Sequence, residues 1–236
     1  MSELPEWLVP WLPAGTASSW TTIAKAVPRQ AYLVGGTALT AHLRHRRSND
    51  LDFFFEDAID LDGVRAALEH LGPFAVTTHE DHTLNGQFDE TKVQFLHAAK
   101  QTRLAPTMEV AGIEVASLSD ILAMKLKVIA DRGELRDYFD LMRIEQDTGR
   151  TVEEGLGLYL ARYRDRSDSN AFLSVIRGLG YFGDVLDDDE LPSRRAAIEA
   201  YWTRRQPEIM RNISREPTVA DPPRGASGSD SPAGPC

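Results

Sequence analysis

Residues 35–52 read GGTALTAHLRHRRSNDLD: a double glycine, a helix-length segment, and an Asp-x-Asp pair that enters an apolar run. The apolar residues 31–34 before this stretch and 51–55 at its end have the composition of short strands. Side chains alternate between the two faces of a strand, so Asp50 and Asp52 should present both carboxylates on one face. The stretch therefore predicts a strand, a turn, a helix and a second strand that carries two acids.

This order suits a site for a metal-bound nucleotide. Glycines at a strand-to-helix turn let the backbone approach a phosphate, whose charge is favoured by the free N–H groups of the helix. Two carboxylates on a rigid strand attract a hard divalent cation, and Mg²⁺ with few protein ligands shares its shell with phosphates. Each signal is weak alone, because double glycines are common in turns and acid pairs are common on solvated strand edges. Their combination in this order favours the nucleotide site.

Composition narrows the class of protein. The chain has 236 residues, enough to bury a sizeable core, and its formal net charge of −10 argues against a general affinity for nucleic acid while leaving room for a local basic patch. The single cysteine, Cys236, offers no internal disulfide and no cysteine metal site. No apolar run has the length of a membrane span and no signal peptide is recognisable, so we expect a cytoplasmic protein without membrane association.

The chain divides into a mixed first half and a helical second half. Before residue 117 the pattern predicts a helix at 61–71 and strands at 31–34, 51–55, 74–78, 91–96 and 113–115. After it, helices are predicted at 119–132, 134–147, 152–163, 170–179 and 193–213. The expected fold class is α/β (α+β) with a mixed sheet. We expect an α/β core with a helical lead-in over 1–116, a helical domain over 117–213, and a disordered Pro/Gly/Ser-rich tail over 214–236.

The helix predicted at 119–132 carries a lysine on its apolar face. Large apolar residues between 118 and 129 define one broad side, and Lys125 falls at its centre. A lysine in a buried stripe needs an anion. Either it extends to solvent or pairs with a structural carboxylate, or it points at a nucleotide phosphate or the metal-binding acids.

The following helix carries two kinds of charged residue. Asp137 borders its apolar side and is placed to hold Lys125 or Arg132. Three other residues share a face at spacings of four and three, which predicts an ordinary surface ion-pair ladder of Arg136, Asp140 and Arg143.

Other common catalytic signatures are missing from the sequence. His42 and His45 have no third ligand at a recognisable spacing, so we interpret them as surface histidines. The chain has no Gly-x-Ser-x-Gly motif and no Walker loop, which removes the common hydrolase and P-loop interpretations.

Two separated blocks resemble the AbiEii/AbiGii nucleotidyltransferase toxin family, a branch of the DNA polymerase β-like superfamily. The first block runs from Gly35 to Phe54, and the second comprises residues 120–126, Arg132 and residues 136–141. The resemblance covers roughly residues 32–141 and implies a minimal nucleotidyltransferase core followed by helices. It also implies transfer of a nucleoside monophosphate from an NTP to an acceptor, reported for relatives to be tRNA 3′ ends, usually beside an antitoxin partner.

The resemblance assigns roles within one candidate site. The two acids of the Asp-x-Asp pair match a metal-binding motif and would hold Mg²⁺ or Mn²⁺, the glycine turn would cradle the β- and γ-phosphates, and a lysine would neutralise the triphosphate. The candidate catalytic residues are Asp50, Asp52, Lys125 and Asp137. The candidate nucleotide-binding residues are Gly35, Gly36, Thr37, Arg46 and Lys125, with Arg47 as an alternative to Arg46.

The chain departs from the superfamily pattern at one position. A third acid is common on a later strand, and here the expected slot holds Gln94. Glutamine cannot act as a general base, so activation of the acceptor hydroxyl would fall to metal, to water, or to Asp89 or Glu90. Two alternatives stay open: a catalytically weak module that binds NTP or a partner, which Gln94 favours, and a less favoured glycosyltransferase that uses Asp-x-Asp to hold a nucleotide sugar.

Overall fold

The structure is a computed structural model that describes residues 3–131 and 133–215. Apart from its first two residues, which end the last helix, the tail predicted at 214–236 lies outside the described residues, as does Arg132. Within the described part, no helix combines the length and the apolar character needed to cross a bilayer.

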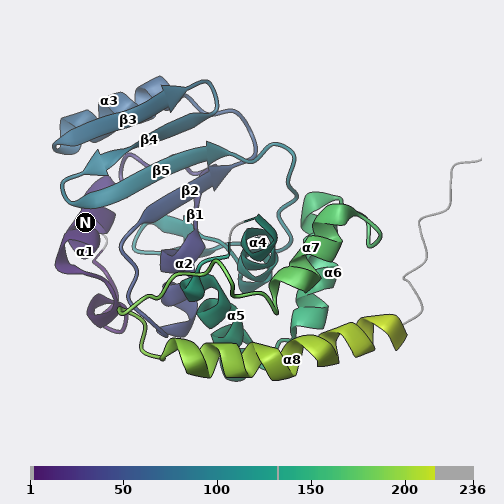
Figure 1. The fold of residues 1–236 in the computed structure, drawn as a ribbon. Coiled ribbons are helices and arrows are strands. Elements are labelled where there is room, and N and C mark those ends of the chain that lie inside the picture. Colours follow the sequence, from purple (N-terminus) through teal and green to yellow (C-terminus); the bar gives the residue numbers. More distant parts are fainter. Residues whose placement is uncertain (1–2, 132, 216–236) are drawn as a thin grey trace, which may run out of the picture.

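The described residues form a mixed seven-stranded sheet in the order β3-β4-β5-β2-β1-β7-β6 (Figure 1). Strand β1 pairs antiparallel with β2 and parallel with β7, and β2 pairs parallel with β5. The strands are β1 Tyr32–Val34, β2 Leu51–Phe55, β3 Phe74–Glu80, β4 Thr83–Phe88, β5 Thr91–His97, β6 Met108–Val110 and β7 Ile113–Val115. The predicted α/β class with a mixed sheet is confirmed.

Two of these strands were not predicted from the sequence. Strand β4 contains Asn85 and Gly86, a pair that is typical of turns, yet it lies between β3 and β5 and pairs with both. A Cβ at Gly86 would lie 2.5 Å from the Phe74 ring, so the glycine is required by close packing. Strand β6 is only three residues long and depends on its hairpin with β7.

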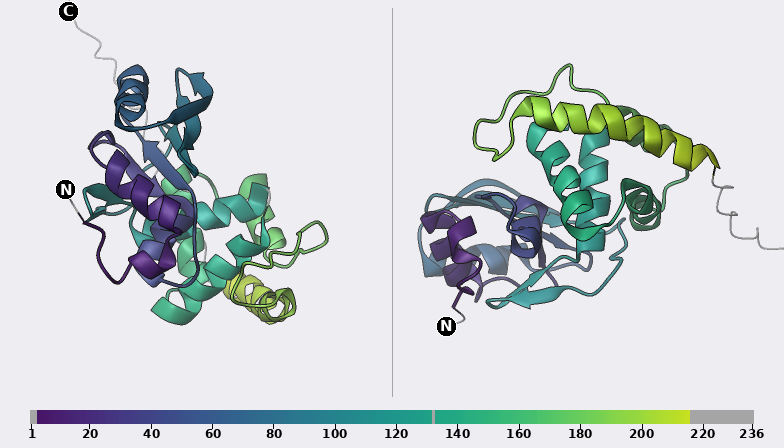
Figure 2. Two further views of the ribbon diagram at one scale, coloured as in Figure 1. Left: turned by 90° about the vertical axis from the view of Figure 1, so that its left-hand side faces the viewer. Right: turned by 90° about the horizontal axis from the view of Figure 1, so that it is seen from below.

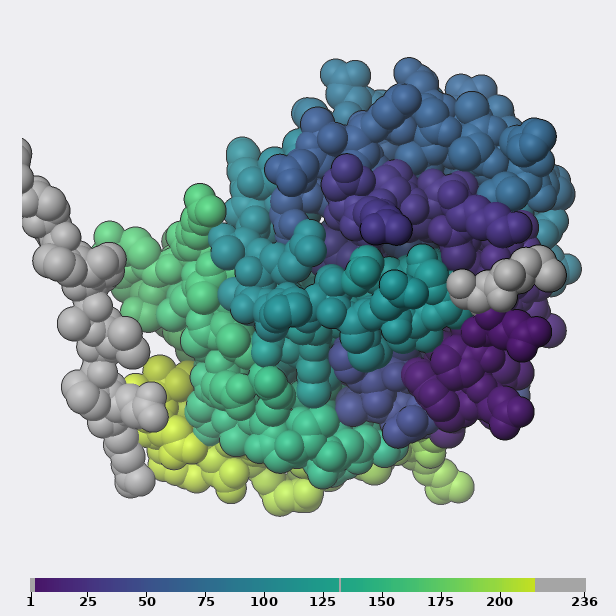
Figure 3. Space-filling model, turned by 180° about the vertical axis from the view of Figure 1, so that it is seen from behind, coloured from purple at the N-terminus to yellow at the C-terminus, as the bar shows by residue number. Residues whose placement is uncertain are grey.

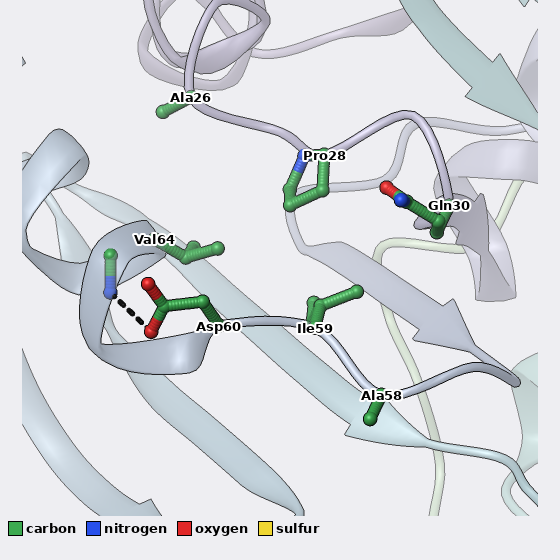
Figure 4. A pocket seen from close by; sticks show the side chains of 8 residues that line it. Ala26, Pro28, Gln30, Ala58, Ile59, Asp60 and Val64 are labelled. Atoms are coloured by element: carbon green, nitrogen blue, oxygen red, sulfur yellow. Dashed lines mark hydrogen bonds between the residues drawn. The ribbon is translucent and has the colours of Figure 1, made fainter.

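The helices follow the predicted order. They are α1 Ala14–Ile23, α2 Gly35–Leu43, α3 Leu61–Leu71, α4 Leu118–Asp131, α5 Leu135–Thr148, α6 Val152–Tyr163, α7 Asn170–Gly178 and α8 Arg195–Arg215, with a 3-10 turn at Val9–Trp11. Local signals explain their ends, because Asp60, Thr151 and Ser169 each accept a hydrogen bond from the first turn of the helix that follows. Figure 4 shows the Asp60 cap at an open hollow lined by Pro28, Gln30 and Ile59.

The two halves of the chain occupy different sides of the molecule. Helix α3 lies behind β3 and β4, while α4 to α7 gather beyond β1 and α8 runs along their outer side (Figures 1 and 2). From behind, the purple and blue N-terminal half and the green and yellow helices flank the teal segment of β6 and β7 (Figure 3). Helix α2 bridges the halves because it contacts β1 and β2 as well as α4 and α5.

A buried ion pair ties the helical half to the sheet. Arg162 on α6 pairs with Asp120 on α4, and both side chains have an exposed fraction of 0%. The same guanidinium donates to the hydroxyl of Tyr32 on β1 at 3.2 Å and to Gln101 at 3.0 Å. Asp120 also accepts from the backbone N–H of Leu104 at 2.9 Å. The pair thus joins two helices, a strand and a loop.

Candidate active site

A cleft of about 690 Å³ opens where α2, β2, β4, β5, α4 and α5 meet. Its walls contain all the predicted catalytic and nucleotide-binding residues except Thr37. The residues come from both halves of the chain, so the tertiary structure assembles them.

The two acids stand at the start of β2. Leu51, Phe53 and Phe55 are buried, and Asp52 lies between them on the opposite face, toward the cleft. Burial, and then the nearby Asp50, raise the pKa of Asp52 to about 6. Its Oδ1 is buried and finds no hydrogen-bond partner among the described residues. The predicted alternation is confirmed, and it leaves a buried carboxylate oxygen without a hydrogen-bond donor among the described residues.

The double glycine forms the turn into α2. Gly35 has φ +73°, and a Cβ there would lie 2.9 Å from Oδ2 of Asp52. A Cβ on Gly36 would lie 2.7 Å from Arg46 Nη2 and 2.8 Å from Ser48 Oγ. Val34, the N-cap residue of α2, makes no side-chain hydrogen bond to the first turn, and the N–H groups at such a helix start can receive an anion. Only glycine fits this turn without displacing the acid and arginine beside it.

Thr37 is the predicted nucleotide-binding residue that does not line the cleft. Its side chain is buried, and its hydroxyl donates to the backbone carbonyl of Asp50 at 2.5 Å and lies 2.9 Å from Ser48 Oγ. The helical phase of α2 turns this hydroxyl toward the start of β2. Thr37 therefore supports the backbone that carries the first acid.

Lys125 lies where the apolar stripe of α4 placed it. Its Nζ is 2.8 Å from Asp137 Oδ1 and 2.6 Å from Asp140 Oδ2, and the side chain is almost entirely buried. Burial alone would lower the pKa of Lys125, but Asp137 and Asp140 raise it above its usual value. The lysine is therefore charged; it donates a hydrogen bond to Asp137 and forms an ion pair with Asp140.

Asp137 is held by its own contacts. One oxygen accepts from Lys125, and the other accepts from the backbone N–H of Glu134 at 3.0 Å as part of the cap of α5. The prediction that it borders the apolar side and meets Lys125 is confirmed. Because both oxygens are engaged, its structural part is to hold the lysine.

Arg46 reaches the cleft beneath the glycine turn. Its guanidinium donates to Asp140 from Nε at 2.6 Å and from Nη2 at 2.8 Å. Asp140 also accepts from His45 Nε2 at 2.7 Å. Arg46 thus lines the cleft as predicted, while most of its donors are already occupied.

The predicted surface ladder on α5 is wrong. Asp140 has an exposed fraction of 0%, whereas Arg136 pairs with Glu134 and Arg143 pairs with Asp147 at 2.7 Å. His45, interpreted as a surface residue, is buried as well. Helix α5 packs this face against α2, and cations distant in sequence compensate the acid.

Gln94 stands directly beside Asp52. The parallel register of β2 and β5 pairs the two residues, and the antiparallel register of β4 places Asn85 next to Gln94. Both amides line the cleft, whereas Asp89 and Glu90 do not. Within residues 3–131 and 133–215, no three His, Cys, Asp or Glu side chains are grouped to hold a metal ion. On the sheet side the cleft therefore offers Asp50 and Asp52 with the neutral amides of Gln94 and Asn85 beside them.

One wall of the cleft was missed in the sequence. The connector 179–194 between α7 and α8 contributes Asp188, Glu190 and Leu191, and in Figure 1 it crosses in front of α2. Lys92 on β5 and Ser48 also line the cleft. Lys92 could have been predicted from the sequence: it lies two residues before Gln94 on one strand, and side chains at that spacing share a face. For the connector no local signal exists.

Solved structures share this fold. A candidate nucleotidyltransferase from H. pylori is 18% identical with a TM-score of 0.55, and the match covers 84% of this chain and 93% of that one. The nucleotidyltransferase toxin MenT4 (Rv2826c) from Mycobacterium tuberculosis H37Rv is 17% identical with a TM-score of 0.50, covering 86% and 87%. The fold is thus that of nucleotidyltransferases.

Sequence comparison supplies the family. The model of the nucleotidyl transferase AbiEii toxins of type IV toxin–antitoxin systems matches residues 24–105 and 79–221, and the chain belongs to this family. It is accordingly a nucleotidyltransferase, which uses an NTP and releases pyrophosphate. A protein of Aquifex aeolicus, aq_aa25, described as uncharacterized, is 27% identical over 186 residues that cover 77% of this chain and 88% of the relative. Family and fold set aside the glycosyltransferase interpretation.

Proposed function

We propose that this enzyme transfers a nucleoside monophosphate to the 3′ end of an RNA acceptor such as tRNA, with Asp50 and Asp52 holding Mg²⁺ or Mn²⁺. The observation that carries the proposal is the unpartnered, buried Oδ1 of Asp52 beside Asp50 and the glycine turn. We further propose a cognate antitoxin and a cytoplasmic location; membership of the AbiEii toxins of type IV toxin–antitoxin systems supports both. We also propose the division into an α/β core over 1–116 and a helical domain over 117–213.

The residues present fit a divalent cation. Carboxylate oxygens are the ligands that Mg²⁺ prefers, and two protein carboxylates leave the remaining positions to water and phosphate oxygens. Burial, and then the charge of Asp50, raise the pKa of Asp52; a cation there would compensate both and would give Oδ1 a partner. When bound, such an ion neutralises phosphate charge and favours departure of pyrophosphate.

The chain's own groups would hold the triphosphate. The N–H groups at the start of α2 would receive phosphate oxygens, and the charged ammonium of Lys125 lines the cleft. The acceptor hydroxyl would attack the α-phosphorus, and the bond to the bridging oxygen of the β-phosphate would break. Gln94 replaces a third acid beside Asp52, so no third carboxylate of that strand takes the acceptor proton.

One experiment tests both the RNA acceptor and the metal role of Asp50. Purified protein is incubated with Mg²⁺, each α-labelled NTP and total tRNA, and labelled RNA is measured on denaturing gels. We expect labelling by the wild type and a loss of at least about 100-fold in Asp50→Asn, because a metal ligand matters more than an outer partner. Asp57→Asn, an exposed acid outside the cleft, is the matched control and should label normally.

Two other results would change the proposal. Equal labelling by the wild type and Asp50→Asn would contradict the metal role of Asp50. The alternative of a binding module, which Gln94 favours, would gain support if Mg²⁺-NTP raised the melting temperature while no transfer product formed with any NTP.

The glycine turn gives a separate prediction. Gly36→Ala should lower kcat/KM for NTP by about 10- to 100-fold, because the new methyl displaces Arg46 and Ser48 from the phosphate turn. Gly157→Ala is the matched control: it lies in α6 with nothing within 4 Å of the added carbon. That variant should keep full activity and gain about 0.5–1 kcal/mol of stability. Steady-state pyrophosphate release measures kcat/KM in both variants. Normal kinetics in Gly36→Ala would show that the turn does not hold phosphate.

A further inference from the structure

Asp140 is the point where the charged residues at the base of the cleft converge. The carboxylate does not line the cleft itself, yet it contacts Arg46 and Lys125, which do. We propose that Asp140 is a positioning residue for nucleotidyl transfer, which fixes Lys125 and the glycine turn relative to one another. The proposal rests on the nucleotide site described under the proposed function and adds a residue that the sequence placed on the surface.

Both oxygens of Asp140 are engaged by cations and hydrogen-bond donors. Oδ1 accepts from His45 Nε2 at 2.7 Å and from Arg46 Nε at 2.6 Å. Oδ2 accepts from Arg46 Nη2 at 2.8 Å and lies 2.6 Å from Lys125 Nζ. Three hydrogen bonds and one further ion pair thus surround the carboxylate. Because Asp140 is fully buried and does not line the cleft, its part in the reaction is indirect.

These contacts join three helices beneath the glycine turn. Asp140 belongs to α5 and Lys125 to α4, while Arg46 follows α2 and accepts through its carbonyl from Thr40 of that helix at 2.9 Å. The Arg46 guanidinium lies directly against Gly36. Movement of Arg46 would therefore move the turn that is proposed to receive the phosphates.

The charges explain why one acid is needed at this place. Arg46 and Lys125 repel each other, and Asp140 lies between them. His45 contributes little charge, because burial lowers its pKa and its Nδ1 has no partner among the described residues. Without the negative charge of Asp140, Lys125 would keep only Asp137, and the two cations would move apart.

The expected kinetic signature separates positioning from binding. Asp140→Asn removes one negative charge near a site for a triphosphate, so attraction of the NTP should not weaken. Misplacement of reacting groups by about 1 Å costs on the order of 100-fold in rate. We therefore expect kcat to fall by about 100-fold, while KM for NTP changes by less than about threefold.

Asp120→Asn is the matched control. Asp120 has the same exposed fraction of 0% and the same dependence on a buried arginine, but it does not line or contact the nucleotide side of the cleft. Both variants should lower the melting temperature. Only Asp140→Asn should lower kcat per folded molecule, and Asp140→Glu, which keeps the charge, should recover part of the rate. If Asp140→Asn does not fold, kcat per folded molecule is compared between the wild type and Asp140→Glu instead.

A second readout needs no turnover. Hydrogen exchange of the backbone amides in residues 35–39 should be faster in Asp140→Asn than in the wild type and unchanged in Asp120→Asn. If the wild type showed no transfer but the exchange difference were present, the proposed function would be contradicted and the positioning role would stand. Equal exchange and equal kcat per folded molecule in the two asparagine variants would overturn the positioning role, as would a rise in KM with kcat unchanged.

Discussion

Asp52→Asn is expected to lose nucleotidyl transfer and to gain stability at the same time. The carboxylate would be needed for the metal, so transfer should fall by more than about 100-fold. In the protein without metal, however, the ionised group is unfavourable, since burial and Asp50 raise the pKa of Asp52 from 3.8 to about 6. A neutral amide of the same shape removes that cost.

The direction of the pH dependence follows from the raised pKa. The folded state binds the proton of Asp52 more tightly than the unfolded state, so this group lowers stability as pH rises from about 4 to 6. The difference corresponds to at most roughly 3 kcal/mol above pH 6. The advantage of Asp52→Asn should thus be full at pH 7.5 and nearly absent at pH 4.

Thermal and urea unfolding in EDTA at the two pH values measure this advantage. Addition of Mg²⁺ should stabilise the wild type at pH 7.5 and have little effect on Asp52→Asn. A variant that is less stable than the wild type in EDTA at pH 7.5 would show that Asp52 is satisfied within the protein and does not await a cation.

Arg162→Met is expected to give the largest loss of stability. The substitution leaves Asp120 buried and unpaired, and breaking a buried ion pair from one side costs about 3–5 kcal/mol. It also removes the hydrogen bonds to Tyr32 and Gln101 that join α6 to the sheet and to the loop beside the cleft. Urea denaturation should therefore show a much lower midpoint.

Two comparisons make this result specific. The double variant Arg162→Met with Asp120→Asn should recover part of the loss, because the unpaired charge is gone. Arg65→Met, which breaks the exposed i,i+4 pair with Glu69, should change the midpoint little. A similar midpoint for Arg162→Met and Arg65→Met would contradict the stabilising role of the buried pair.

Several features of the site could be predicted because their causes are local. Strand alternation placed Asp52 toward the cleft, and helical phase placed Lys125 on a buried face next to Asp137. The glycine turn follows from backbone geometry, since Gly35 has a positive φ and Gly36 has no room for a Cβ. Periods of two and 3.6 residues are properties of short segments, and they are readable without the rest of the chain.

Other features failed at the sequence level for a common reason. Asp140 and His45 look exposed by local spacing, but they are buried because α5 packs against α2 and brings Arg46 and Lys125 to them. A charged residue is buried only where compensating charges meet it, and no short segment contains them. Strand β4 failed similarly, because its neighbours β3 and β5 override its turn-like residues.

The sequence by itself determined the strand, turn and helix unit, the pair of acids and the family to which the chain belongs. Only the tertiary structure decided that Thr37 supports Asp50, that Gln94 adjoins Asp52, and that the connector 179–194 closes one side of the cleft. The physical reason is range: dihedral preference and periodicity act over a few residues, whereas pairing of strands and compensation of buried charge depend on residues that meet only after folding.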